Sequence, residues 1–148
     1  MLKLPPPIWM FIALALCGVA SALYPWKALA DLTWRWPGIA LTIAAFAFAL
    51  WGRMTFFFAK TEINPPSPSN RVLVTAGPFA FTRNPMYLGL VLFSFGIALW
   101  AGSWPMFLVP VFLFWLCNTV HIPFEEAKMQ RQFPDAFAAY TARVRRWI

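Results

Sequence analysis

The sequence predicts an all-α protein that crosses a membrane about four times and ends in a cytoplasmic amphipathic helical segment. Hydrophobic residues make up 61% of the chain and charged residues only 11%, whereas soluble domains carry about 25% charged residues. The apolar residues form long runs that are separated by short polar connections. A chain of 148 residues has room for one domain, which is too small to hide this much hydrocarbon from water.

Four apolar runs approach or reach the length of about 17 to 25 residues that a helix needs to cross a bilayer. They lie at about residues 8–23, 38–58, 86–101 and 105–122. The first run also resembles a secretory signal peptide, but we expect it to be a retained span. The tight turn at 101–103 makes the third and fourth spans an antiparallel hairpin.

Two polar segments interrupt or follow these runs. The loop at 59–85 is rich in Pro, Asn, Ser and Thr. It ends in closely spaced side chains that can carry charge or form hydrogen bonds. A connection of this length in a compact domain is usually functional or disordered, and its apolar residues favour an ordered loop. In the tail at 123–148, apolar residues recur at helical spacing but Pro134 interrupts them. This pattern predicts two short helices that meet at Phe133 and Pro134.

The basic residues predict the orientation. If the loop is cytoplasmic, that side collects Lys3, Arg53, Lys60, Arg71, Arg83, Lys128, Arg131, Arg143, Arg145 and Arg146. The opposite side keeps only Lys27 and Arg35, so both termini are expected in the cytoplasm. An aromatic belt at the outer interface would then contain Trp26, Trp34, Trp36, Trp100 and Trp104.

The net charge of +7 does not indicate nucleic-acid binding, because the basic residues flank apolar spans instead of alternating with exposed aromatic residues. Cys17 and Cys117 lie singly inside apolar runs, without the neighbours that a metal site needs. We therefore expect no nucleic-acid partner and no metal.

The hairpin brings the start of the third span to the end of the fourth. The groups brought together are Arg83, Asn84, Tyr87, His121, Glu125 and Glu126. Ionisable groups at membrane depth are costly and indicate function. Each residue alone has a structural alternative: the two glutamates could complement a helix dipole, and His121 could simply end a span.

Two segments at this separation, LVTAGPFAFTRNPMYLG and HIPFEEAKMQRQFPDAFAAYTARV, resemble a family of membrane enzymes. This is the isoprenylcysteine carboxyl methyltransferase-like and phospholipid methyltransferase group, which uses S-adenosylmethionine. The resemblance covers Thr61 to Ile148. The matching positions are Gly77, Pro78, Phe79, Arg83, Pro85, Tyr87, Gly89, Glu125, Glu126, Phe133, Phe137, Tyr140, Arg143 and Val144. The family's histidine before the proline is Asn84 here, and an amide cannot act as a base.

The resemblance implies a cytoplasmic pocket for S-adenosylmethionine. The catalytic candidates are Arg83, Asn84, Glu125 and Arg143. The cofactor-binding candidates are Gly77, Pro78, Arg83, Asn84, Tyr87, Leu88, His121, Glu125, Glu126 and Tyr140. A guanidinium suits the cofactor carboxylate, a glutamate suits the ribose or the amino group, and the tyrosines suit adenine or the sulfonium.

The expected reaction is methyl transfer to a lipophilic acceptor that enters from the lipid, as in isoprenylcysteine carboxyl O-methylation. The alternative is N-methylation of an ethanolamine phospholipid. A small four-span transporter is a weaker alternative, because no acidic residue lies at the centre of a span. The expected location is a bacterial inner membrane.

Overall fold

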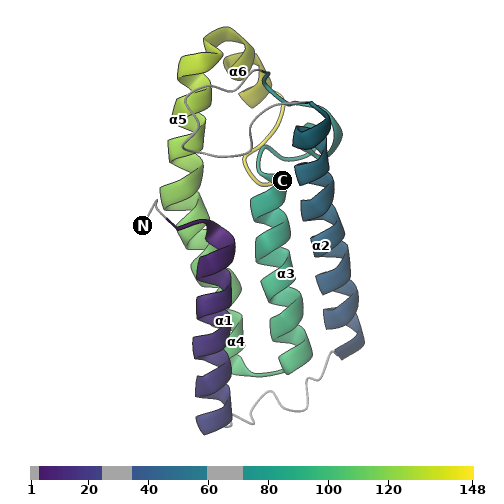
Figure 1. Cartoon of the computed structure of the whole chain (residues 1–148), viewed down its shortest axis with the longest axis vertical. Helices are drawn as coiled ribbons and strands as arrows, with labels where there is room; N and C mark the ends of the chain where they lie inside the picture. The colour runs from purple at the N-terminus through teal and green to yellow at the C-terminus, as the bar shows by residue number, and fades with distance from the viewer. Residues whose placement is uncertain (1–3, 25–34, 60–71) are drawn as a thin grey trace.

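The computed structural model describes residues 4–24, 35–59 and 72–148. Every regular element in these ranges is helical, and the long helices run alternately up and down in one bundle (Figure 1). The elements in chain order are α1 (Pro6–Leu23), α2 (Arg35–Phe58), a 3₁₀ turn η2 (Gly77–Ala80), α3 (Pro85–Ala101), α4 (Trp104–Leu116), a π-helical turn η3 (Cys117–His121), α5 (Ile122–Gln132) and α6 (Pro134–Thr141).

Three helices are long and apolar enough to cross a membrane, namely α1, α2 and the continuous helix Trp104–Gln132. The fourth apolar helix, α3, has 17 residues, which corresponds to about 25 Å. The expected all-α membrane protein is therefore confirmed. The α3–α4 hairpin occupies the centre, because α1 packs mainly on α4 and α2 packs on α3.

The last long helix does not end where the sequence pattern placed the end of the fourth span, near residue 122. Instead, α4, η3 and α5 form one helix of 29 residues, about 43 Å long at 1.5 Å per residue. A bilayer core is only about 30 Å thick. The α5 end therefore extends past α1, α2 and α3, as Figure 1 shows.

The π-helical turn explains why proline does not stop this helix. The Ile122 N–H donates to the Cys117 carbonyl, five residues back. This wider turn lies immediately before Pro123, whose ring would otherwise press on the Thr119 carbonyl. The helix ends only at Phe133, and Pro134 begins α6. The predicted break at Phe133 and Pro134 is confirmed.

Small residues let α2 and α3 approach closely. A Cβ added to Gly96 would lie 2.4 Å from Thr42 Oγ1 and 2.7 Å from the Thr42 backbone nitrogen. A Cβ added to Gly89 would lie 2.7 Å from Ala49 Cβ. Contacts of this kind are typical of membrane helices, which associate through close packing because lipid offers no hydrophobic driving force between them. Gly89, one of the positions that match the family pattern, thus has a packing role between α2 and α3.

The other side of the hairpin is a conventional apolar core. Met10 of α1 packs with Val109 and Leu113 of α4. At the turn between α3 and α4, Gly102 ends α3 with φ 63°, a left-handed conformation that favours glycine. The predicted tight hairpin turn is therefore present.

Three of the five tryptophans expected in the outer belt lie in the described ranges. Trp36 is the second residue of α2, Trp100 is near the end of α3 and Trp104 begins α4. All three are more than half exposed, and these helix ends lie at the lower end of the bundle in Figure 1. Trp26 and Trp34 lie outside the described residues, as do Lys3, Lys27, Lys60 and Arg71.

Candidate functional site

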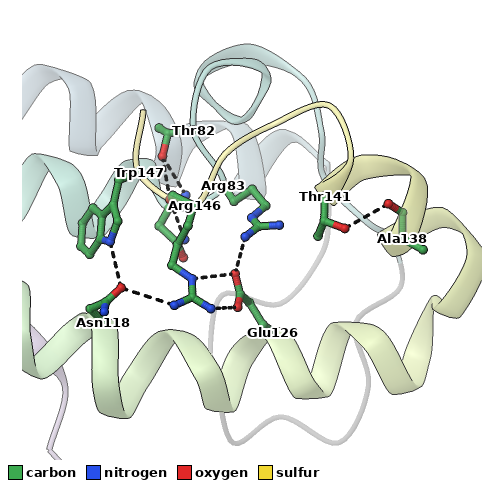
Figure 2. Close-up of polar contacts among 9 residues, drawn as sticks. Thr82, Arg83, Asn118, Glu126, Ala138, Thr141, Arg146 and Trp147 are labelled. Carbon is green, nitrogen blue, oxygen red and sulfur yellow. Dashed lines mark hydrogen bonds and ion pairs between the residues drawn. The ribbon is translucent and has the colours of Figure 1, made fainter.

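Polar side chains gather at the end of the bundle where α3 begins. They come from residues 82–87, from η3 and α5, and from the C-terminal residues 145–147. Figure 2 shows the part of this group that surrounds Glu126 and Arg146. The first of these segments is more than 30 residues from the others in sequence. The hairpin and the returning C-terminus bring all of them together.

The segment before α3 is held by a buried turn. Gly77 has φ 62°, which favours glycine, and Pro78 and Phe79 behind it are buried. The Tyr140 hydroxyl of α6 donates to the Phe79 carbonyl at 2.7 Å. Burial raises the pKa of Tyr140 to about 12, so this hydroxyl keeps its proton and remains a donor. Gly77, Pro78 and Tyr140 support the candidate site from outside the polar cluster.

An ion-pair cluster surrounds Glu126 of α5. Arg83 Nη2 lies 3.0 Å from Glu126 Oε1. Arg146 donates from Nη2 to Oε2 at 2.5 Å and from Nε to Oε1 at 3.3 Å, which is the two-bond fork that guanidinium groups form with carboxylates. One carboxylate therefore has two guanidinium partners, and the cluster carries an excess positive charge.

A second cluster lies between α3 and the last long helix. The Tyr87 hydroxyl donates to Glu125 Oε1, and the Tyr87 ring centroid is 6.3 Å from that of His121. His121 is 4% exposed. Because adjacent residues on an α-helix point about 100° apart, Glu125 faces Tyr87 while Glu126 faces the two arginines.

Two buried nitrogen atoms in these clusters have no hydrogen-bond partner among the described residues. They are Arg83 Nε and His121 Nε2. Buried polar atoms are nearly always hydrogen-bonded, and exceptions often mark a site for water, an ion or a ligand. Each cluster contains one of these unpartnered atoms, so each cluster could form a further hydrogen bond to a bound molecule.

Most of the predicted site residues lie together. The two clusters contain Arg83, Tyr87, His121, Glu125 and Glu126. Asn84 borders them, and its Nδ2 donates to the Arg146 carbonyl at 2.9 Å. Leu88 is half-buried on the first turns of α3. Arg143 is not brought into the clusters: it is exposed, and its Nε donates to the Ala139 carbonyl of α6.

Three residues in or beside the clusters are not among those predicted from the sequence, namely Asn118, Arg146 and Trp147. Asn118 Oδ1 accepts from Arg146 Nη1 at 3.4 Å and from Trp147 Nε1 at 3.0 Å. A lone amide in an apolar run is a signal that could have identified Asn118, because unpaired polar groups are costly there. No sequence signal distinguishes Arg146 from Arg143 and Arg145.

The sequence model of the family described as phospholipid methyltransferase matches residues 33–136, which is more than half of the chain. The chain belongs to the phospholipid methyltransferase family. No curated protein and no solved structure gives a significant match.

Membership of this family confirms the resemblance seen in the sequence and identifies the chain as a membrane methyltransferase. The matched region runs from before α2 into α6 and contains both clusters except Arg146. It also includes α2, which precedes the segment Thr61 to Ile148 that carries the resemblance. Members of methyltransferase families generally use S-adenosylmethionine. The family match does not distinguish a prenylated acceptor from a phospholipid.

Proposed function

We propose that this protein transfers a methyl group from S-adenosylmethionine to a lipophilic acceptor at the membrane face where α3 begins. The observation that carries the proposal is the pair of buried, unpartnered nitrogens, Arg83 Nε and His121 Nε2. They lie beside two acidic side chains in a membrane methyltransferase.

The residues present fit S-adenosylmethionine. Arg83 keeps a free Nε–H and lies in a cluster with excess positive charge, which suits the cofactor's carboxylate. Glu125 suits its amino group or ribose hydroxyls, and the Tyr87 ring can contact the sulfonium or the adenine. When bound, the cofactor supplies an electrophilic methyl group on sulfur.

The protein's own contribution to methyl transfer would be mainly positional. Holding two reactants in line can be worth several kcal/mol without any covalent chemistry. The Tyr87–Glu125 hydrogen bond and the Glu126 ion pairs fix the side chains that would orient the reactants. The surrounding apolar helices limit the access of water.

Carboxyl O-methylation of a prenylated cysteine, the reaction expected from the sequence, needs no base because the acceptor is already an anion. One observation favours the second candidate, an ethanolamine phospholipid. An amine must lose a proton, and a buried imidazole nitrogen without a partner can accept one when the other ring nitrogen carries the hydrogen. His121 is therefore proposed as the group that receives the proton from an amine acceptor.

The purified protein in lipid nanodiscs is expected to bind S-adenosylhomocysteine by calorimetry. Labelled S-adenosylmethionine should then transfer its methyl group to phosphatidylethanolamine in preference to S-farnesylcysteine. Label found only in S-farnesylcysteine would select carboxyl methylation. An absence of S-adenosylhomocysteine binding in both detergent and lipid would contradict the methyltransferase proposal.

We also propose that the candidate site and both termini face the cytoplasm of a bacterial cell. Exposed arginines at the end that carries the site are Arg53, Arg131, Arg143 and Arg145. Among the residues that the structure describes, Arg35 is the basic residue at the opposite end. A C-terminal reporter that is active only in the cytoplasm should therefore be active in a bacterial host, and activity of a periplasmic reporter would reverse the orientation.

A further inference from the structure

We propose that residues 145–147 form a C-terminal strap that completes the candidate site, with Arg146 as a positioning residue for Arg83 and Glu126. The inference rests on the proposed function. The strap lies outside the region that matches the family, which ends at residue 136.

The strap is joined through its backbone to the segment before α3. The Arg83 N–H donates to the Arg145 carbonyl at 3.0 Å. The Arg146 carbonyl accepts two hydrogen bonds, from Thr82 Oγ1 at 3.2 Å and from Asn84 Nδ2 at 2.9 Å. Thr82 and Asn84 are both less than 10% exposed, so this junction is buried.

Side chains of the strap contact the last long helix, which lies across the site from the start of α3. The Arg146 guanidinium uses Nε and Nη2 on Glu126 and Nη1 on Asn118. The Trp147 ring lies 4.8 Å from the Phe114 ring, between centroids, and its N–H reaches Asn118. Figure 2 shows Arg146 and Trp147 extending from the strap toward this helix. The strap therefore connects the start of α3 to α4 and α5.

This arrangement keeps Arg83 available for a ligand. Arg146 takes both oxygens of Glu126, and Arg83 keeps only a single contact through Nη2. Arg83 Nε remains unpartnered. Without the Arg146 side chain, Glu126 could form the two-bond fork with Arg83 instead. Glu126 would then neutralise the charge of Arg83. An anionic group of the cofactor would have to displace Glu126 to bind Arg83.

The test compares Arg146 with Arg131, an exposed arginine of α5 that lies outside the strap. Arg146→Ala is expected to raise the Kd for S-adenosylhomocysteine and the KM for S-adenosylmethionine about tenfold, with a much smaller change in kcat. Arg131→Ala removes the same charge from an exposed position and should change neither constant more than about twofold. Arg146→Lys should recover only part of the affinity, because its ammonium group keeps the positive charge but cannot form the two-bond fork with Glu126.

The two proposals fail in different ways. A wild-type protein that does not bind S-adenosylhomocysteine would contradict the proposed function itself. Wild-type binding with unchanged Kd and KM in Arg146→Ala would overturn the strap alone. If Arg146→Ala does not purify as a folded protein, the Arg146→Lys variant decides: a raised KM supports the positioning role, and a wild-type KM overturns it.

Discussion

Arg83→Ala is expected to weaken binding of S-adenosylhomocysteine by about 30-fold or more, because loss of one partner of a buried charged contact costs about 2 to 5 kcal/mol. The Arg83 side chain is only 15% exposed, and its Nε is the unpartnered donor proposed to meet the cofactor carboxylate. Calorimetry in nanodiscs measures the effect directly. Arg83→Lys should bind with intermediate affinity, since lysine keeps the charge but not the planar fork.

The protein should still fold after this substitution, because Glu126 keeps its fork with Arg146. Arg53→Ala is the matched control, since Arg53 is exposed at the same end of the bundle and should leave the affinity within about twofold. Glu125→Ala is expected to weaken binding as well, because Glu125 holds the Tyr87 hydroxyl. Wild-type affinity in both Arg83→Ala and Glu125→Ala would place the cofactor pocket elsewhere.

Gly96→Ala is expected to destabilise the fold by about 2 kcal/mol, within the range for overpacking a close contact. The added methyl group would lie 2.7 Å from the Thr42 nitrogen and 2.8 Å from the Gly38 carbonyl oxygen. Both are backbone atoms, so α2 and α3 would have to move apart. The midpoint of reversible unfolding in mixed detergent micelles reports the loss.

The control for this prediction is also a glycine-to-alanine change in an apolar helix. A Cβ added to Gly18 of α1 would have no atom within 4 Å, so Gly18→Ala should change stability by less than about 0.5 kcal/mol. Equal unfolding midpoints for Gly96→Ala and Gly18→Ala would mean that α2 does not pack on α3 as described.

Much of the architecture could be predicted from sequence because it depends on local properties. Apolar runs locate helices in a membrane, because a backbone in lipid must satisfy its own hydrogen bonds. Gly102 marks the hairpin turn, because glycine tolerates the left-handed conformation that ends α3. Pro134 marks the start of α6, because proline cannot continue a helix but fits its first position. The hairpin then places Arg83 at the level of Glu126, which the ion pair between them confirms.

The end of the last long helix at Gln132 could not be located from the sequence. The apolar run ends near residue 122, but a helix can continue as a polar one beyond the bilayer. The π-helical turn before Pro123 relieves the clash that would otherwise stop it. Hydropathy reports the solvent around a segment, and it does not report where the backbone hydrogen bonds end.

The sequence by itself determined the all-α membrane fold and the family, and it supplied the candidate site residues Arg83, Tyr87, His121, Glu125 and Glu126. Only the tertiary structure decided which glutamate meets Tyr87 and which meets the arginines, and that Arg146 enters the cluster while Arg143 stays outside. These choices depend on contacts such as that between Asn84 and Arg146, 62 residues apart. Helical periodicity specifies the face on which a side chain lies, whereas its partner is set by how the chain packs across that face.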